Sequence, residues 1–311
     1  FVEAYPSGVS TSLPVDVQND FIHSIKGFEN AEITKPGYAI EYDYFPPTQL
    51  KHSLETKLVS GLFFAGQING TTGYEEAACQ GLMAGINSHL LLNEKEPFVL
   101  DRSEAYIGVL IDDLITKGTE EPYRMFTSRA EYRILLRQDN ADERLTQKGF
   151  DIGLASKHRL DTFLKKKTEV EDLLKYFSFE SVSPEEINPV LTKNNTPVAQ
   201  QAFKIEKFLS RPQIQLPDLE GVEKIKEKLR PFSEEVRQSA EILTKYKGYI
   251  KREKEAADKL NKLEYIKIHK DFDYHQVHSL SSEAKEKLSK LKPVSIGQAS
   301  RISGVTPSDI S

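Results

Sequence analysis

A glycine-rich segment between residues 61 and 85 has the residue types that bring backbone N–H groups against a bound cofactor. Its apolar start, Leu62 to Ala65, is expected to form a short strand. Thr72 and Glu75 fit a T-x-x-E capping box, so a helix is expected to follow directly. Three glycines between strand and helix permit a tight turn and a close approach of the chain: Gly66, Gly70 and Gly73. A strand, turn and helix N-terminus in this order suit cofactor binding, although a helix packed on its own sheet would show the same pattern.

The negative charge near the predicted helix start limits which part of a cofactor could bind there. Glu75 and Glu76 suit the helix dipole but would repel a pyrophosphate. A flavin ring fits better, because its reduced form carries negative charge near its N1 atom that a helix N-terminus can stabilise. Gln67 could hydrogen-bond a ribityl hydroxyl or the ring edge, or it could simply cap the turn. Small residues further along the helix leave room for a large neighbour: Ala77, Ala78, Gly81, Ala84 and Gly85.

Arginines recur between residues 122 and 137 at a spacing that suits phosphate binding. Ser128 and Glu131 fit a second capping box, so a helix is expected to begin there. Three arginines would then share one face, with a fourth just ahead of them: Arg129, Arg133 and Arg137, and Arg124. Three aromatic residues interleave and could stack on bases or pack in a core: Tyr123, Phe126 and Tyr132. The alternative is a solvated helix face whose arginines pair with Glu131 or Asp139.

Other polar residues more often have structural roles. Cys79 is expected to be a buried thiol, because no histidine lies nearby to favour its thiolate. Asp112 and Asp113 could act as acids but more often such residues cap helices or pair with arginines, and Asp139 and Asp142 are expected to order the arginines. Three histidines fit no tight zinc motif and are expected at the surface: His269, His275 and His278.

A second basic cluster lies beside Tyr246 and Tyr249 and is diluted by Glu253 and Glu255. A solvated helix face is expected there, with nucleic-acid contact as the alternative. The cluster consists of five side chains: Lys245, Lys247, Lys251, Arg252 and Lys254.

Helices are expected to dominate after about residue 98, following a strand–loop–strand–helix arrangement from about residue 38 to 92. Residues 183–220 contain five prolines and are expected to form loops and short helices. Apolar spacing and cap residues predict the main helices: 15–25, 105–115 ended by Gly118, 155–177, a long helix capped by Ser233, and one starting at Thr306–Pro307.

Length and composition limit the class of protein. A chain of 311 residues can hold two domains with cores, and its net charge of −5 means that any nucleic-acid-binding surface must be local. The single cysteine fits a reducing cytoplasm. No apolar run approaches the roughly 18 residues of a membrane span, so no membrane association is expected.

Three long motifs cover the chain except for a variable middle near residues 155–230. The first joins Pro36–Asp43 with Gly66–Gly81, the second joins Pro122–Arg133 with Arg137–Asp142, and the third is Ser295–Pro307. In this order the three motifs resemble the MnmG/GidA family. The resemblance implies an FAD-dependent enzyme that adds a carboxymethylaminomethyl or aminomethyl group to carbon 5 of the tRNA wobble uridine.

The resemblance also implies partners and site residues. NADH and methylene-tetrahydrofolate are co-substrates in the family, and homodimers assemble with the G protein MnmE into a heterotetramer in the cytoplasm. The family's cysteine nucleophile lies upstream of the matched motifs, so no catalytic residue and no metal site is expected here. The implied FAD contacts are Gly66, Gln67, Gly70, Thr71, Thr72 and Gly73, and the implied tRNA contacts are Arg124, Arg129, Arg133 and Arg137.

The fold expected from this resemblance is α/β followed by all-α: the C-terminal part of an FAD-binding Rossmann-like (glutathione-reductase-like) domain and then a helical C-terminal domain. No G-x-G-x-x-G fingerprint follows a strand, so the chain is expected to be the C-terminal part of a longer protein that alone holds FAD weakly and has no turnover. The expected divisions are 1–36, the end of an inserted domain; 37–95, the FAD-binding part; 96–240, a helical tRNA-binding region; and 241–311, a helical subdomain that docks a partner or tRNA.

Two other functions fit parts of the sequence. The folate- and FAD-dependent tRNA uridine methyltransferase family shares the Gly66–Gln67 type of turn, but it lacks the long helical tail and the arginine motif. The chain could also be a non-catalytic module that binds tRNA or a partner protein.

Overall fold

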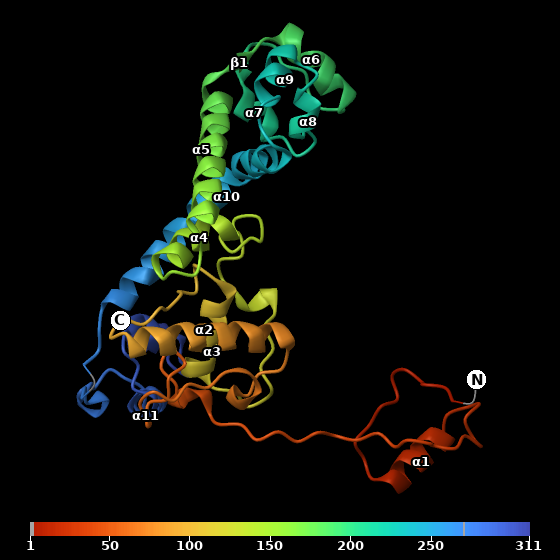
Figure 1. The fold of residues 1–311 in the computed structure, drawn as a ribbon, viewed down its shortest axis with the longest axis vertical. Helices are drawn as coiled ribbons and strands as arrows, with labels where there is room; N and C mark the ends of the chain where they lie inside the picture. Colours follow the sequence, from red (N-terminus) through yellow and green to blue (C-terminus); the bar gives the residue numbers. More distant parts are fainter. Residues whose placement is uncertain (1–2, 270) are drawn as a thin grey trace. The chain divides into compact units, whose positions relative to one another are not determined.

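The computed structural model describes residues 3–269 and 271–311, and the chain divides between Phe45 and Pro46 into two compact units (Figure 1). The first unit contains one helix, α1 (Val15–His23), which confirms the helix expected near this position. Gln18 is the buried residue of α1 and ties the unit together, since its side chain bonds both the N–H and the carbonyl of Gly37 (2.8 and 2.9 Å).

The second unit is helical with a very small sheet. Its strands, β1 (Ser181–Val182) and β2 (Phe203–Lys204), pair antiparallel with Ser181 opposite Lys204. The strand expected over Leu62–Ala65 is wrong for the described residues, since only Phe63 forms a single bridge, with Glu55. Residues 36–45 are likewise assigned to no strand. A strand forms where a neighbouring strand pairs with it over several residues, and the sheet of the described residues contains only β1 and β2.

Helices carry the rest of the second unit. Its long helices are α2 (Tyr74–Leu92), α3 (Tyr106–Lys117), α4 (Ala141–Asp151), α5 (Lys157–Phe179) and α10 (Glu234–Tyr265). The shorter ones are α6 (Pro184–Lys193), α7 (Ile205–Leu209), α8 (Leu216–Leu219), α9 (Glu223–Leu229), α11 (Ser282–Leu291), α12 (Ile296–Arg301) and α13 (Pro307–Ile310). Four 3-10 turns join them: η1 (Pro47–Gln49), η2 (Gly66–Asn69), η3 (Thr127–Arg129) and η4 (Tyr274–Gln276). Helices α5 and α10 lie side by side, and α6 to α9 gather at one end of this pair (Figure 1).

Cap residues explain where several of these helices begin and end. The Ser233 hydroxyl accepts a hydrogen bond from the Val236 N–H and so starts α10, as expected. Gly118 ends α3 with φ of +70°, a backbone conformation that favours glycine. Thr306 forms a full capping box with Asp309 at the start of α13. The helix boundaries predicted from these residues are therefore confirmed.

Three larger apolar clusters stabilise the second unit. One lies wholly between residues 170 and 240 and joins α5 to α6–α9 and the start of α10. A second packs α2 against α3 and the loop that contains Leu50 and Leu54. The third holds the C-terminal helices together around Ala284 and Leu288. Within the part of the chain that the structure covers, none of the helices is long and apolar enough to traverse a lipid bilayer.

Candidate functional site

The glycine-rich loop adopts a conformation that only glycine takes easily. Gly66, Gly70 and Gly73 have φ values of +83°, +73° and +128°. Residues 66–69 form η2, and α2 begins at Tyr74. At Gly66 an added Cβ would lie 3.5 Å from the Cβ of Ala77, so the loop passes close over the first turns of α2. The turn expected from the three glycines is confirmed.

Gln80, fully buried in α2, holds this loop from beneath. Its Oε1 accepts hydrogen bonds from the Gly66 N–H (3.2 Å) and the Asn69 amide (2.8 Å), and its Nε2 donates to the Thr71 hydroxyl (2.9 Å). The Thr71 hydroxyl in turn donates to the Gly66 carbonyl (3.0 Å). Thr71 therefore shapes the loop from the inside, with only 2% of its surface exposed. Gln80 is not among the site residues predicted from the sequence, where its one signal is a polar side chain one helical turn after Glu76.

The outer side of the loop is open. Gln67 and Thr72 are exposed, and the Gln67 side chain makes no hydrogen bond within the described residues. Beside them the first turn of α2 presents backbone N–H groups that have no acceptor inside a helix. An outward amide next to free N–H donors matches the hydrogen-bonding edge of a flavin ring, so the residues present fit that group.

The capping box expected from Thr72 and Glu75 is wrong. Gly73 is the N-cap of α2, and no side chain caps it. The Thr72 N–H, which the Glu75 carboxylate would accept from in a capping box, donates to the Tyr123 carbonyl instead (2.8 Å) and so pairs the loop with another segment. Glu76 turns inward instead, and a Cβ at Gly73 would lie only 1.9 Å from its carboxylate.

Glu76 and Tyr123 connect the loop to the arginine-rich segment. The Tyr123 N–H donates to the Gly70 carbonyl (2.8 Å), which completes a parallel bridge with Thr71 at its centre. Two residues further on, the Met125 N–H donates to Glu76 Oε1 (2.9 Å). Three hydrogen bonds therefore fix the glycine loop and the arginine-rich segment in one register.

The arginine-rich segment is not the helix that its capping box predicted. Only Thr127–Arg129 form a 3-10 turn, and turns continue until α4 begins at Ala141. The reason lies in burial: Ala130 and Tyr132 are both buried (5% and 6% exposed). Arg129, Glu131 and Arg133 are exposed, so burial alternates residue by residue, which is the period of an extended chain and not of a helix. Arg129, Arg133 and Arg137 therefore do not share a helix face.

The four arginines have different environments. Arg124, Arg129 and Arg133 are exposed, and Arg137 is half-buried. The Arg129 guanidinium lies 4.3 Å from the centroid of the Tyr123 ring, and its Nε donates to the Arg124 carbonyl (2.9 Å). Within the described residues the guanidinium groups of Arg124 and Arg133 have no partner, which leaves both available to a phosphate.

Two acidic residues were expected to order these arginines. Asp139 does so, since its carboxylate accepts a hydrogen bond from Arg137 Nε (3.0 Å). Asp142 does not, because it pairs with Lys166 of α5 (2.8 Å). The expectation was correct for Asp139 and wrong for Asp142.

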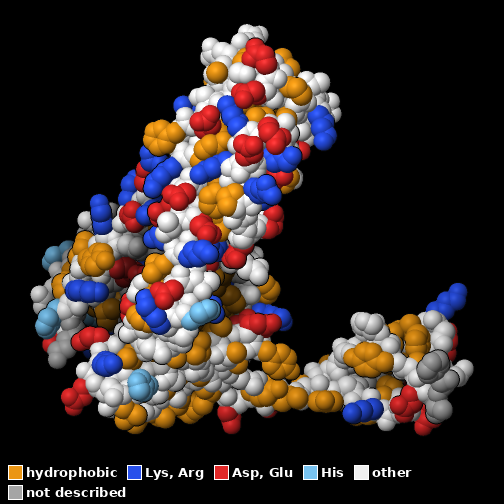
Figure 2. Space-filling model, turned by 45° about the horizontal axis from the view of Figure 1, so that its top comes forward, with side chains coloured by type: hydrophobic (Ala, Val, Ile, Leu, Met, Phe, Trp, Pro, Cys, Tyr) orange, Lys and Arg blue, Asp and Glu red, His pale blue; other side chains and the backbone are white. Residues whose placement is uncertain are grey.

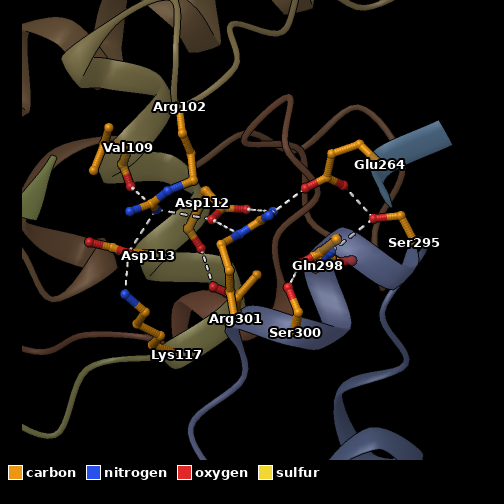
Figure 3. A network of polar contacts seen from close by, with 12 residues as sticks. Arg102, Val109, Asp112, Asp113, Lys117, Glu264, Ser295, Gln298, Ser300 and Arg301 are labelled. Carbon is orange, nitrogen blue, oxygen red and sulfur yellow. Dashed lines mark hydrogen bonds and ion pairs between the residues drawn. The ribbon is translucent and has the colours of Figure 1, made fainter. Parts of the chain in front are cut away.

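The aspartates of α3 belong to a buried ionic network (Figure 3). Asp112, with 4% of its side chain exposed, lies between two arginines from distant parts of the chain. Arg102 donates to it over 3.0 Å, and Arg301 of α12 binds it with two hydrogen bonds (2.6 and 2.8 Å). Asp113 accepts from Arg102 (2.8 Å) and from the Tyr123 hydroxyl (2.9 Å). Both aspartates are paired, as such residues commonly are, but with Arg102 and Arg301 rather than with the arginine-rich segment.

The protonation states of this network follow from its charges. Burial alone would raise the pKa of Asp112, but contacts with His52 and Arg301 and the charge of Arg102 lower it far below its usual value. Burial opposes the charged form of Arg102, yet Glu131, Asp113 and Asp112 outweigh it and raise the pKa of Arg102. Local patterns could not reveal this network, because Arg301 and Asp112 are 189 residues apart in sequence.

Glu264, near the end of α10, completes the link to α12. It pairs with Arg301 and accepts a hydrogen bond from the Ser295 hydroxyl, the N-cap of α12 (Figure 3). Gly297 allows this approach, since a Cβ there would lie 2.5 Å from the Glu264 carboxyl group. Helices α3, α10 and α12 are thus joined by one chain of ion pairs.

Cys79 corrects another expectation, because it is exposed rather than buried. The surrounding protein and the charges of Glu76 and Glu75 raise the pKa of its thiol, so it carries no thiolate at neutral pH. His269 lies 3.8 Å from Asp271 at the surface. Within residues 3–269 and 271–311, no group of three or more His, Cys, Asp or Glu side chains is arranged to hold a metal ion.

Three models of one family match most of the chain. They are described as "Glucose inhibited division protein A" (residues 2–96), "tRNA modifying enzyme MnmG/GidA C-terminal helical domain" (residues 157–254) and "tRNA modifying enzyme MnmG/GidA C-terminal helical bundle" (residues 256–311). Residues 97–156, which hold the arginines, fall between these matches.

Relatives and solved structures agree with these matches. Two proteins named tRNA uridine 5-carboxymethylaminomethyl modification enzyme MnmG, from Christiangramia forsetii and Flavobacterium psychrophilum, are each 60% identical over 100% and 99% of this chain. The chain spans about half, 50%, of the length of each. A crystal structure of Aquifex aeolicus GidA superposes with a TM-score of 0.78 and 46% identity, over 98% of this chain and 48% of that one. The chain belongs to the MnmG/GidA family.

Proposed function

We propose that this chain forms part of an FAD-dependent enzyme that modifies carbon 5 of the wobble uridine in tRNA, adding a carboxymethylaminomethyl or aminomethyl group. The observation that carries the proposal is the hydrogen-bonded register between the glycine loop and the arginine-rich segment. Thr72 N–H to Tyr123, Tyr123 N–H to Gly70 and Met125 N–H to Glu76 hold a flavin-compatible wall beside exposed arginines. A site that joins a redox cofactor to an RNA strand needs both features side by side.

The flavin wall is formed by the loop of residues 66–73. Gln67 would hydrogen-bond the ring edge or ribityl chain, while Thr72 and the first-turn N–H groups of α2 line the same side. Gly66, Gly70, Thr71 and Gly73 would shape the wall. FAD, when bound, would supply the redox chemistry, with NADH as reductant and methylene-tetrahydrofolate as one-carbon donor. In the family the attacking cysteine lies outside these motifs, so this chain's contribution is to bind and orient.

The tRNA contacts would come from Arg124, Arg129 and Arg133, with Arg137 held by Asp139 at the edge. Arg129 is pre-oriented by the Tyr123 ring, whose hydroxyl is itself fixed by Asp113. Three exposed guanidinium groups on an irregular segment can follow the curved backbone of a folded RNA. The overall charge of −5 means that this attraction is local and falls with added salt.

Replacing Arg124 and Arg133 tests the RNA assignment. We expect Arg124→Ala with Arg133→Ala to weaken tRNA binding and to reduce the slope of log K against log salt by about two, since each phosphate contact contributes about one. Arg159→Ala on α5 is the control, because it removes an equally exposed arginine outside the segment. Titration of labelled tRNA at several salt concentrations measures both quantities. An unchanged slope would place the RNA site elsewhere.

The remaining features of the assembly follow the family. We infer a cytoplasmic homodimer that works with the G protein MnmE. The C-terminal helices that include Ser295–Val305 would dock this partner or tRNA. We propose 1–36, 37–95, 96–240 and 241–311 as the functional parts of the chain. The second candidate function is a module that binds tRNA or a partner without catalysis. The half-length match to the MnmG relatives favours it for this chain taken alone.

A further inference from the structure

Two exposed tyrosines on α10 have no role in the function proposed above. Tyr246 and Tyr249 lie one helical turn apart and are 44% and 55% exposed. Their ring centroids are 6.3 Å apart, with the ring planes inclined by 55°. The Arg252 guanidinium lies 4.8 Å from the centroid of the Tyr249 ring. An exposed aromatic pair backed by an arginine is the arrangement on which unpaired nucleic-acid bases stack.

This pair lies next to the arginine-rich segment. The Leu135 N–H donates to Glu253 Oε2 of α10 (2.9 Å), and Leu135 is two residues after Arg133. Tyr249 precedes Glu253 by four residues, so the two side chains are neighbours on one side of the helix. An RNA strand that contacts Arg133 would therefore also lie near the tyrosines.

The charge around the tyrosines favours an anionic partner. Between residues 245 and 255 there are five basic side chains and two acidic ones. Glu253 is already engaged by Leu135, and Lys245 and Lys247 pair with Glu241 and Glu206 (both 2.9 Å). Elsewhere along α5 and α10, Lys and Arg side chains alternate with Asp and Glu on the face drawn in Figure 2. Lys251 lies 4.0 Å from Glu255, so Arg252 and Lys254 are the basic side chains of this stretch that have no acidic partner among the described residues.

We propose that Tyr246, Tyr249 and Arg252 form a stacking surface for unpaired nucleotides of the RNA whose phosphates the arginine-rich segment binds. The proposal rests on the proposed function, since it names a second contact for the same RNA. The two parts recognise different chemistry. Arginines bind the backbone of any RNA, whereas the tyrosines select bases that are free to unstack.

Removing the two tyrosine rings distinguishes base stacking on α10 from phosphate binding by the arginine-rich segment. We expect Tyr246→Ala with Tyr249→Ala in the full chain to weaken binding of an anticodon stem-loop RNA about tenfold. The salt slope should stay unchanged, because no phosphate contact is lost. Binding of a fully paired RNA duplex should change little. The Tyr246→Phe/Tyr249→Phe variant keeps the rings and should bind like the parent. Phe179→Ala, which removes an exposed aromatic (76% exposed) at the end of α5, is the matched control.

Several outcomes would overturn the stacking surface. Equal binding of the stem-loop by the Ala variant and the parent would do so, as would an equal loss for stem-loop and duplex. Loss of binding to a G protein partner with unchanged RNA binding would assign the tyrosines to that protein instead. If the parent itself binds no RNA at low salt, the proposed function fails. If the parent binds RNA and the tyrosine substitutions leave this binding unchanged, the failure is confined to the stacking surface.

Discussion

Glu76 is the residue on which the geometry of the candidate site depends most directly. Its carboxylate is buried (6% exposed) and accepts the Met125 N–H, while Gly73 leaves room for it by having no side chain. Gln80 performs the same task one turn later for Gly66, Asn69 and Thr71. The loop is thus rigid on its inner side and exposed at Gln67, which is the arrangement that a pre-formed binding wall requires.

Glu76→Ala should destabilise the chain by about 1–3 kcal/mol, because it leaves the partly buried Met125 N–H without an acceptor. Glu76→Gln retains an oxygen at the same position and should cost clearly less. Urea unfolding followed by circular dichroism gives both free energies. Equal stabilities of the Ala and Gln variants would mean that the hydrogen bond does not hold the two segments together.

At the scale of elements, helices α3, α10 and α12 are joined by charge rather than by apolar packing alone. Asp112 accepts from Arg102 and Arg301, and Glu264 links Arg301 to the N-cap of α12. Removing one member of a buried ion pair leaves the other charge unpaired, which costs more than the pair contributes. The α12 end of the chain is therefore sensitive to single substitutions in α3.

Asp112→Asn should lower the free energy of unfolding by about 3 kcal/mol at pH 7, since Arg102 and Arg301 lose their shared carboxylate. Asp139→Asn, which breaks the more exposed pair with Arg137, should cost under about 1 kcal/mol. Denaturant titrations of both variants and the parent measure the difference. Similar costs for the two substitutions would contradict a buried network.

The difference in unfolding free energy between the parent and Asp112→Asn should depend on pH in one direction. The pKa of Asp112 is lowered in the folded state, so its stabilisation is complete above the unfolded-state value of about 3.9. It is lost as pH falls through the lower folded-state pKa, where the parent carboxyl group becomes protonated. The stability gap between the parent and Asp112→Asn should therefore be constant from pH 7 to 5 and narrow only in strong acid. A gap that narrows near pH 6 would point to another group.

Elements with local signals were predictable from the sequence, and those without were not. Ser233, Gly118 and Thr306 determine helix ends through their own side chains or backbone, and the structure places the ends there. The strand at Leu62–Ala65 was wrong because pairing depends on a neighbour, not on the strand itself. The helix at Ser128 was wrong because burial alternates between Arg129 and Arg133, with Ala130 and Tyr132 inward, as in an extended chain.

The candidate site was predictable only in part, for the same physical reason. The glycine turn follows from backbone conformation, which is a local property, and Gly66, Gly70 and Gly73 confirm it. The contacts of Glu76 with Met125 and of Asp112 with Arg301 join residues 49 and 189 positions apart. Such contacts depend on how helices pack, and no local pattern specifies them. The roles of Gln67 and the arginines in binding stay predictions.

At the scale of the whole molecule, the chain would supply one wall of the proposed flavin site. Gln67 and Thr72 face outward, and no phosphate-binding glycine fingerprint accompanies them in the sequence. Its curated relatives are about twice as long, with 50% of their length matched. Affinity for a cofactor as large as FAD would therefore be weak in this chain alone.

The purified chain, incubated with FAD and desalted, should retain far less than one flavin per chain and show no turnover with NADH. Absorbance between 350 and about 500 nm would report the bound flavin. Gln67→Ala should lower any residual binding further, since it removes the outward amide of the loop. Retention of one FAD per chain would contradict the prediction and show that the wall of residues 66–73 is sufficient to bind the cofactor.

Helix α10 runs unbroken for 32 residues, a rod of about 48 Å. Near its start it packs on α5, α7 and α8, and near its end on α12. A rigid rod acts as a lever: a tilt of about 5° at one end displaces the other by about 4 Å. Motion of a partner seated on the last helices would thus be transmitted mechanically past Tyr249 to the opposite end, without any change in the helix itself.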